Sequence, residues 1–362
     1  MSWAYQNPVR VQFGVGALDQ VAPAIAGRPW ALVTYGMDLF RALGQRIARQ
    51  AGPPVTIIDD ISANPDFADL DGIGRRFAAA GRTGVVVALG GGSVIDAAKV
   101  LATAGGDFAA VRAHLVDGAP LDAGRILPVL AVPTTAGTGS EVTCWATVWD
   151  AAGGRKYSIA HPGLYPEAAI VDPALTLAAP HGLTLATGLD ALSHALESLW
   201  NVNANPVSAQ FAIAAAREVL DVLPRLLERP GDVALRTRQS QASLLAGLAF
   251  SNTKTALAHN ISYDVTLRHG TAHGIACSFS LPQVMRWAIG REPACDERLA
   301  AIFGPDLAAG ADRLQRFLED LGVPTDPAAH GLDAGEWVRL VDKAFAGERG
   351  RNFIGRRELA AE

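Results

Sequence analysis

A carboxylate and an imidazole stand one helical turn apart in the segment Gly188-Leu-Asp190-Ala-Leu-Ser-His194-Ala-Leu-Glu197. Its apolar residues recur at helical spacing, so Asp190 and His194 share one face of the predicted helix. Two such side chains can hold one divalent metal ion. Farther along, His259 and His273 lie in a second apolar stretch. Any one of these histidines alone is more simply a buried, hydrogen-bonded residue, but one Asp and three His together predict a catalytic metal site with an open position.

A run of three glycines follows a predicted strand and opens a predicted helix in Leu89-Gly-Gly-Gly-Ser93-Val-Ile-Asp96-Ala-Ala-Lys99. Glycines let backbone amides approach a phosphate closely, and a helix N-terminus adds a positive dipole end. The loop is therefore predicted to bind phosphate, although it is not the GxGxxG fingerprint. The alternative is a plain tight turn without a ligand. In that case Ser93 caps the helix, and Asp96 is simply a favourable acidic residue in its first turn.

A second loop of small residues, Pro133-Thr-Thr-Ala-Gly-Thr-Gly-Ser-Glu-Val-Thr143, also follows a predicted strand. Alone it could be a polar connection without a ligand. Two such loops after strands of one sheet indicate a nucleotide crevice. Lys156 is near enough in sequence to reach a ribose or phosphate, although a single lysine is more often a solvated charge.

The first half of the chain alternates β-rich runs with helical patterns, which predicts βαβ units and a doubly wound parallel sheet. A helix is expected over Phe67–Ala80, and a hairpin over Cys144–Trp149 and Lys156–Ala160. The runs expected to form the main strands are Val9–Phe13, Trp30–Tyr35, Val55–Ile58, Gly84–Leu89 and Leu127–Val132.

From about Pro180 the strand signals almost vanish and helical patterns follow one another. We therefore predict an α/β dinucleotide-binding domain over residues 1–178 and an all-helical metal-binding, catalytic domain over residues 179–362. The expected helices are Leu185–Trp200, Pro206–Glu228, Ala234–Ser251, Thr255–Leu267, Pro282–Ile289 and Ala309–Leu321.

The composition argues against several classes of partner. The chain has 362 residues, of which 49% are hydrophobic and 19% charged, and its net charge is −5. Without a long basic run, nucleic acid and anionic membranes are poor partners. The start lacks a signal peptide pattern, and the uncharged stretches are too short to span a membrane. Three widely separated cysteines do not suggest disulfides, so a cytoplasmic protein is expected.

The motifs taken together resemble the iron-dependent (group III) alcohol dehydrogenases, which share a dehydroquinate-synthase-like fold. That resemblance implies a metal-dependent alcohol dehydrogenase or aldehyde reductase that uses NADPH or NADH. It also implies a homo-oligomer, with a dimer favoured. The segments that carry the resemblance are Gly90–Lys99, Pro133–Thr143, Gly188–Glu197 and Gly247–Pro282.

The resemblance assigns roles to individual residues. Fe²⁺, sometimes replaced by Zn²⁺, would be held by Asp190, His194, His259 and His273. The cofactor pyrophosphate would lie on Gly91, Gly92 and Ser93. The other residues expected at the cofactor are Asp96, Thr134, Thr135, Thr143, Trp145 and Lys156.

The chain departs from the family pattern in three places. Tyr263 stands where many members carry a second His that serves a proton relay, so Tyr263 or His269 is expected to substitute. Thr34-Tyr35-Gly36-Met37 replaces the usual Asp that favours NAD over NADP, which permits NADPH as well as NADH. The C-terminal tail is also short.

The substrate stays open between two classes. Lys254, little more than one turn before His259, would suit a dianion near the metal. This pattern resembles phosphonoacetaldehyde reductases, which would form 2-hydroxyethylphosphonate. The alternative is a solvated Lys254 and a general dehydrogenase of short-chain primary alcohols or diols. Maleylacetate reductases and lyases share the fold. Maleylacetate reductases do not need the metal, so the intact set of one Asp and three His argues against them. A lyase would be expected to carry more basic residues around the metal than this sequence offers.

Overall fold

The computed structural model describes residues 2–356 and divides into two compact units. One unit runs from Asn7 to Ala179 and is α/β, and the other begins at Pro180 and is helical. Residues 2–6 group with the helical unit, unlike the sequence-based division. The reason lies at helix α8 (Val233–Thr253), where the Tyr5 hydroxyl donates to the Leu248 carbonyl and the Gln6 amide donates to the Asn252 side chain.

The α/β unit contains a six-stranded parallel sheet in the order β1-β8-β5-β4-β2-β3. Five of these strands were predicted, whereas β8 was not. Its short run Ala168-Ala-Ile-Val171, flanked by Pro166 and Pro173, gives a weak strand signal. The bounds are β1 (Arg10–Phe13), β2 (Trp30–Val33), β3 (Thr56–Ile58), β4 (Val85–Gly90), β5 (Val129–Pro133) and β8 (Ala168–Val171).

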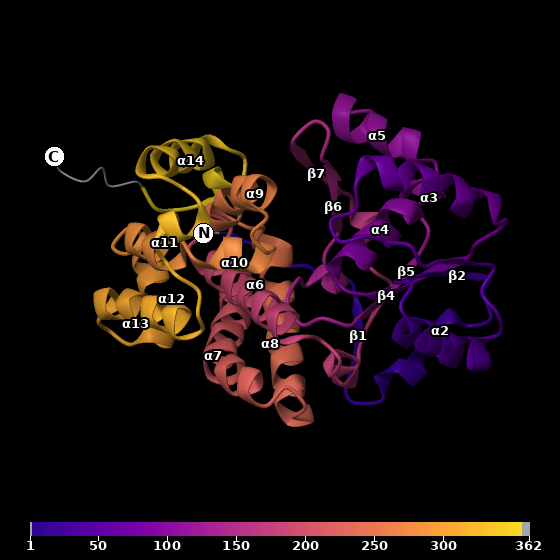
Figure 1. Cartoon of the computed structure of the whole chain (residues 1–362), viewed down its shortest axis with the longest axis horizontal. Helices are drawn as coiled ribbons and strands as arrows, with labels where there is room; N and C mark the ends of the chain where they lie inside the picture. The colour runs from indigo at the N-terminus through magenta and orange to yellow at the C-terminus, as the bar shows by residue number, and fades with distance from the viewer. Residues whose placement is uncertain (1, 357–362) are drawn as a thin grey trace. The chain divides into compact units, whose positions relative to one another are not determined.

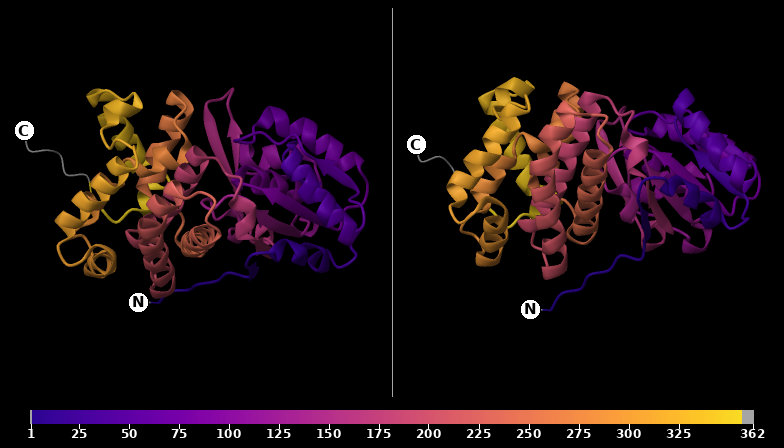
Figure 2. Two further views of the ribbon diagram at one scale, coloured as in Figure 1. Left: turned by 60° about the horizontal axis from the view of Figure 1, so that its bottom comes forward. Right: turned by 90° about the horizontal axis from the view of Figure 1, so that it is seen from below.

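Helices cover both faces of this sheet, as Figures 1 and 2 show. Helices α1 (Val21–Ile25) and α2 (Asp38–Ala51) pack on one face. Helices α3 (Phe67–Ala79), α4 (Gly92–Thr103) and α5 (Phe108–Asp117) pack on the other. Burial on both faces explains the continuous apolar runs of β2, β4, β5 and β8. The predicted α/β class is confirmed.

The strand order reverses between β2 and β4, because β2 is followed outward by β3 while β4 is followed by β5 on its other side. Ligands of doubly wound sheets bind outside the carboxyl ends of strands at such a switch point. The glycine loop directly follows β4. A separate antiparallel hairpin joins β6 (Trp145–Asp150) to β7 (Arg155–Ala160).

The helical unit is built on one hydrophobic core. Its first three helices, α6 (His181–Leu199), α7 (Pro206–Glu228) and α8 (Val233–Thr253), pack against one another. Asn205 and Ser208 form a capping box that fixes the start of α7. The remaining helices are α9 (Leu257–His269), α10 (His273–Ser278), α11 (Leu281–Ala288), α12 (Pro293–Phe303), α13 (Leu307–Asp320) and α14 (Ala334–Ala346).

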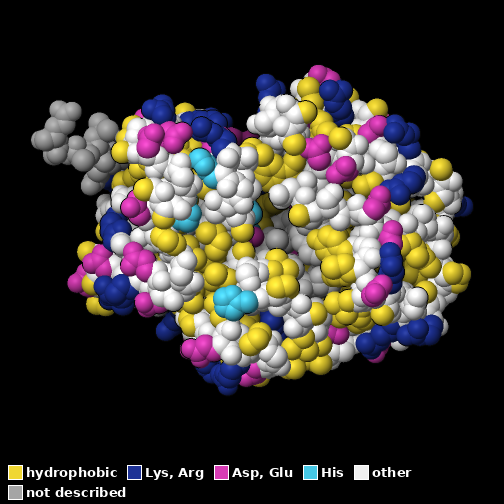
Figure 3. Space-filling model, in the orientation of Figure 1, with side chains coloured by type: hydrophobic (Ala, Val, Ile, Leu, Met, Phe, Trp, Pro, Cys, Tyr) yellow, Lys and Arg dark blue, Asp and Glu magenta, His cyan; other side chains and the backbone are white. Residues whose placement is uncertain are grey.

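Two surface properties bear on the class of protein. Within residues 2–356, no helix is both long and apolar enough to cross a bilayer. On the face drawn in Figure 3, basic and acidic side chains are interspersed on both units, and neither sign forms a continuous patch.

Candidate metal centre

Four side chains from three helices bring possible metal ligands together in the helical unit. Asp190 lies on α6, His259 in the first turn of α9, and His273 and Cys277 on α10. Their ligand atoms all lie within 4.8 Å of one another. Asp190, His259 and Cys277 are buried, whereas His273 is partly exposed. The group therefore offers one oxygen, two nitrogens and one sulfur, with its open side at His273.

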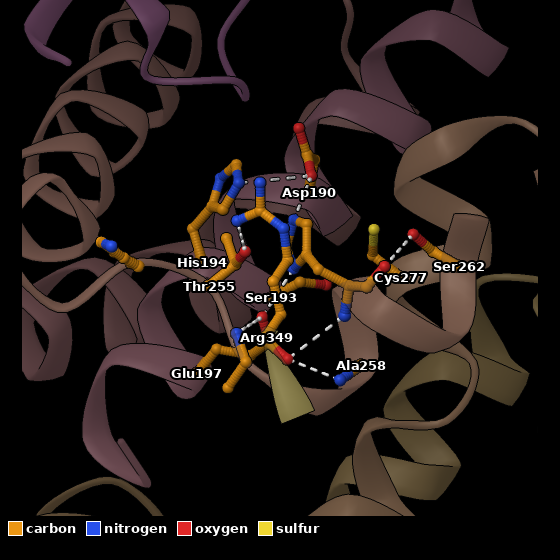
Figure 4. A network of polar contacts seen from close by, with 12 residues as sticks. Asp190, Ser193, His194, Glu197, Thr255, Ala258, Ser262, Cys277 and Arg349 are labelled. Carbon is orange, nitrogen blue, oxygen red and sulfur yellow. Dashed lines mark hydrogen bonds and ion pairs between the residues drawn. The ribbon is translucent and has the colours of Figure 1, made fainter. Parts of the chain in front are cut away.

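Asp190 Oδ1 is the common neighbour of the three predicted imidazoles. It lies 3.4 Å from Nε2 of His259, 3.8 Å from Nε2 of His194 and 4.0 Å from Nε2 of His273. His194 is not part of the tight four-atom group, but it faces the same carboxylate oxygen from one turn farther along α6. Figure 4 shows Asp190, His194 and Cys277 directed toward this common centre.

Within residues 2–356, two buried atoms at this centre have no hydrogen-bond partner: Asp190 Oδ1 and His259 Nε2. Leaving such a group unsatisfied costs about 1–3 kcal/mol or more for a charged group. A cation placed between them would satisfy both. Because nitrogen and sulfur donors accompany the carboxylate, the set suits a transition metal better than Ca²⁺ or Mg²⁺. The residues present fit a divalent transition metal.

Glu197 holds the His259 side chain in place. One of its carboxylate oxygens lies 2.7 Å from Nδ1 of His259 and also accepts the Ala256 amide at 2.8 Å. The other accepts the Ala258 amide at 2.6 Å and the His259 amide at 3.2 Å. Glu197 thus caps the start of α9, where helix amides are otherwise unpaired, and orients the imidazole.

Packing fixes the His194 ring. The His194 ring stacks on Phe250 with centroids 4.0 Å apart, and on His259 with centroids 4.5 Å apart. An imidazole held between two rings has little freedom to rotate. The His194 carbonyl also accepts the hydroxyl of Ser198 at 2.8 Å, one turn along α6.

Electrostatics keep the two carboxylates of this centre ionised. Burial by itself raises the pKa of Asp190, but the neighbouring imidazoles, His194 foremost, outweigh it and hold that pKa well below its ordinary value. Burial also opposes ionisation of Glu197, yet His259 and the amide donors lower its pKa overall. Two carboxylates therefore carry negative charge where a cation would bind.

Cys277 was not singled out from the sequence. Its Sγ lies 3.6 Å from Nε2 of His273, one turn earlier on α10. Burial raises the pKa of the Cys277 thiol. The spacing of His273 and Cys277 repeats that of Asp190 and His194, so an i, i+4 search for paired ligands would have found it.

The predicted phosphate loop lies in the α/β unit, where helix α4 begins directly after Gly91. No side chain caps this helix, so its first amides are not occupied by a cap. Ser93 does not cap it, because its hydroxyl instead accepts the Asn64 amide at 3.2 Å. A Cβ on Gly92 would lie 2.7 Å from Thr138 Cγ2, and one on Gly91 would lie 3.2 Å from Thr135 Oγ1. The two small-residue loops therefore pack together.

Several other predicted cofactor residues have partners within the protein. Asp96 accepts the Ser140 hydroxyl at 2.6 Å and the Thr147 amide at 2.9 Å. The Thr143 and Trp145 carbonyls accept from Lys99 Nζ, at 2.9 and 3.0 Å. These contacts fix the chain between the second loop and the hairpin.

Thr134 is buried and its amide donates to the Gly90 carbonyl at 3.0 Å, which ties the two loops together. Lys156 lies over the Trp149 ring, 5.1 Å from its centroid. Burial lowers the pKa of Lys99, the cation beneath these loops, to about 8.

Tyr263 and Lys254, the two remaining predicted residues, flank His259 in sequence. Tyr263 is half-buried on α9, and the guanidinium carbon of Arg349 lies 5.7 Å from its ring centroid. Lys254 is exposed at the end of α8, with a φ of 64°. Arg349 was missed because it lies far along the chain from the nearest motif, Gly247–Pro282, and no local pattern marks it.

Comparison with known proteins agrees with this geometry. Residues 8–173 match the family described as iron-containing alcohol dehydrogenase, and residues 184–354 match the C-terminal domain of the Fe-containing alcohol dehydrogenase family. The chain belongs to the iron-containing alcohol dehydrogenase family. It is therefore an oxidoreductase, as the sequence predicted.

Members of this family differ in their named substrates. Phosphonoacetaldehyde reductase of Streptomyces viridochromogenes is 34% identical, over 84% of this chain and 78% of that protein. NAD-dependent methanol dehydrogenase of Bacillus methanolicus is 31% identical, over 92% and 90% of the two chains. The crystal structure of sulfoacetaldehyde reductase from Bifidobacterium kashiwanohense in complex with NAD⁺ gives a TM-score of 0.90 at 31% identity, covering 98% and 94%.

Proposed function

We propose that this protein is a metal-dependent reductase of short aldehydes that carry an anionic group, with NADH or NADPH as the hydride donor. The first candidate reaction is reduction of phosphonoacetaldehyde to 2-hydroxyethylphosphonate. The observation that carries the proposal is the gathering of three imidazoles around the unpaired Oδ1 of Asp190.

Asp190, His194, His259 and His273 would hold the metal, with Fe²⁺ the first candidate and Zn²⁺ the second. A divalent cation bound there supplies Lewis-acid polarisation of the substrate oxygen. The protein's part is to present the ligands rigidly. Glu197 keeps the Nδ1 side of His259 occupied, so its Nε2 faces Asp190.

Reduction also requires a proton for the new alcohol oxygen, and Tyr263 is the proposed source. It lies one turn after His259 on α9, on the same face, and is half-buried. The Arg349 guanidinium carbon lies 5.7 Å from the centroid of the Tyr263 ring. His269 suits the role less well, because it is exposed and ten residues, or about 15 Å of helix, beyond His259.

For the cofactor, Gly91, Gly92 and Ser93 are proposed to bind the pyrophosphate at the start of α4, with Thr134 and Thr135 beside them. NADH is proposed as the preferred donor. The first cation after β2 in the chain, Arg41, lies 3.5 Å from Asp38 and 3.7 Å from Asp59. Two carboxylates around one arginine leave little net charge to attract a 2′-phosphate.

The names of two relatives support an anionic aldehyde, because phosphonoacetaldehyde and sulfoacetaldehyde each carry a tetrahedral oxyanion. The second candidate is a general dehydrogenase of short-chain primary alcohols or diols, favoured by the methanol dehydrogenase relative. A metal-free maleylacetate reductase is disfavoured, because it would not need the buried ligand set around Asp190.

The test is a comparison of kcat/KM for phosphonoacetaldehyde, sulfoacetaldehyde and propanal, using Fe²⁺-loaded protein with NADH and with NADPH. We expect the two anionic aldehydes to exceed propanal by at least ~10-fold, and removal of the metal to abolish turnover. Equal or better turnover of propanal would favour the general dehydrogenase instead. Full activity after metal removal would contradict the metal-dependent mechanism.

A further inference from the structure

We propose that Arg349 binds the anionic group of the substrate and so determines the specificity of the site. This inference rests on the proposed function and deepens it. Arg349 immediately precedes the 3-10 helix η7 (Gly350–Asn352), close to the end of the described chain. The ligand class is an aldehyde with a tetrahedral oxyanion, either phosphonate or sulfonate, two bonds from the carbonyl carbon.

Arg349 lies beside the proposed metal ligand His259. Its Nη1 donates to the Thr255 hydroxyl at 2.6 Å, and its guanidinium carbon lies 5.7 Å from the Tyr263 ring centroid. Thr255 is four residues before His259 and Tyr263 is four residues after it. Arg349 therefore contacts residues on both sides of His259 in the sequence. Figure 4 shows the Arg349 side chain extending from its backbone toward Thr255, in the same group of side chains as His194 and Asp190.

The backbone that carries Arg349 is held firmly. Asn352 donates from Nδ2 to the Thr255 carbonyl at 2.8 Å, and the Asn352 carbonyl accepts the Val202 amide at 2.8 Å. One residue farther, Phe353 is buried. A guanidinium on a fixed segment loses little entropy on binding, which favours selective recognition.

The charge of Arg349 is uncompensated. Among residues 2–356, no carboxylate forms an ion pair with it, whereas nearby Lys343 pairs with Asp264 at 2.7 Å and Arg268 pairs with Glu336 at 3.3 Å. Thr255 uses one of the five N–H donors of the guanidinium. The remaining fork matches two oxygens of a phosphonate or sulfonate.

The sequence-predicted cation, Lys254, is less suited to this role. Its side chain is exposed, and it carries a flexible point charge rather than a planar fork. Its carbonyl is fixed by Asn201 Nδ2 at 3.2 Å, which positions the neighbouring Thr255. Lys254 therefore adds general electrostatic attraction for an anion, while Arg349 determines where the anionic group binds.

Arg351, within the 3-10 helix η7 that follows Arg349, offers a matched control. It carries the same charge two residues away, but it is exposed and donates to the Ala346 carbonyl at 3.3 Å. A variant at Arg351 changes the net charge of the segment equally, without touching Thr255 or Tyr263.

The experiment compares the Fe²⁺-loaded wild type with Arg349→Met, Arg349→Lys and Arg351→Gln. For each protein, kcat/KM is measured for phosphonoacetaldehyde, sulfoacetaldehyde and propanal, and the affinity for 2-hydroxyethylphosphonate is measured by calorimetry. We expect Arg349→Met to lower the ratio of anionic to neutral kcat/KM by ~100-fold, mainly through KM, and to weaken 2-hydroxyethylphosphonate binding similarly. Arg349→Lys should fall between, and Arg351→Gln should match the wild type.

An unchanged ratio in Arg349→Met, or an equal loss for anionic and neutral aldehydes, would overturn the inference. If Arg349→Met does not fold, as judged by circular dichroism, the Arg349→Lys variant decides by the same ratio. If the wild type itself prefers propanal, the proposed substrate is wrong, and the calorimetry then decides for Arg349 alone. Equal affinity of wild type and Arg349→Met for 2-hydroxyethylphosphonate would then reject its role.

Discussion

Glu197 and His259 form a buried pair in which the carboxylate lies 2.7 Å from Nδ1 of the imidazole. The same carboxylate accepts three backbone amides at the start of α9. This arrangement leaves Nε2 of His259 as the ring nitrogen that faces Asp190 Oδ1, at 3.4 Å. The His259 imidazole is thus oriented by a carboxylate whose acceptor capacity is directed at α9, which gives Glu197 a positioning role beside the proposed metal ligands.

The Glu197→Gln variant tests this positioning. The amide nitrogen of Gln cannot accept, so at least one amide or the His259 Nδ1–H loses its partner. We expect the affinity for Fe²⁺ or Zn²⁺ to fall ~10–100-fold. Competition with a chelator of known affinity measures this change. Unaltered metal affinity would mean that His259 is oriented by packing alone.

His194 and Cys277 distinguish two ligand sets. The set predicted from sequence contains His194, whereas the tightest group of ligand atoms contains Cys277. We expect His194→Ala to weaken metal binding by more than ~100-fold, because it removes a proposed direct ligand. Cys277→Ala should change it by less than about threefold. The measurements are the metal content after dialysis and the absorption spectrum of the Co²⁺-substituted protein. A large loss of metal in Cys277→Ala and a small one in His194→Ala would show that the thiolate binds the metal in place of His194.

The glycine loop is tested by Gly92→Ala. The added Cβ would lie 2.7 Å from Thr138 Cγ2, so the loop after β4 or the loop after β5 must move. We expect the KM for NADH to rise by at least ~10-fold, equivalent to about 1.4 kcal/mol, with unchanged metal content. Gly72→Ala is the control, because Gly72 lies within α3 and its Cβ would meet nothing within 4 Å. An NADH KM that stays at the wild-type value in Gly92→Ala would exclude this loop from cofactor binding.

The sequence predicted the parts of the molecule that follow from local pattern. The period of α6 placed Asp190 and His194 on one face, and the apolar run 85–89 predicted a buried strand. The contacts that complete the site join distant segments. Glu197 reaches His259 across 62 residues, and Arg349 reaches Thr255 across 94. No periodicity encodes such contacts, because they depend on how the helices pack.

The predicted cofactor residues show the same limit. Residue type and loop position indicated Asp96 and Thr143 for the cofactor, and this remains a prediction. The structure gives both of them protein partners, Ser140 and Lys99, which a sequence pattern does not reveal. A polar residue in a small-residue loop can serve the ligand or the loop itself, and packing decides between the two.

Glu141 provides a test of stability against pH. It is a buried residue of the second loop, in the 3-10 helix η3 (Ser140–Val142), and burial raises its pKa from 4.5 to about 6 despite its own amide and Lys99. Because the pKa of Glu141 is higher in the folded state than in the unfolded chain, its protonated form stabilises the folded protein. This contribution is complete below pH 4.5 and is lost as the pH rises through 6. Ionising this buried carboxylate should cost the wild type about 2 kcal/mol between these values.

The Glu141→Gln variant keeps the shape of the side chain and cannot ionise. We expect the stability of the variant minus that of the wild type to increase as the pH rises from 4.5 to 7. The thermal midpoints of the α/β unit should diverge by about 4–8 °C over this range. Asp117→Asn is the control, because Asp117 is an exposed carboxylate at the end of α5 in the same unit. A difference between Glu141→Gln and wild type that stays constant from pH 4.5 to 7 would show that Glu141 ionises as freely in the folded protein as in the unfolded chain.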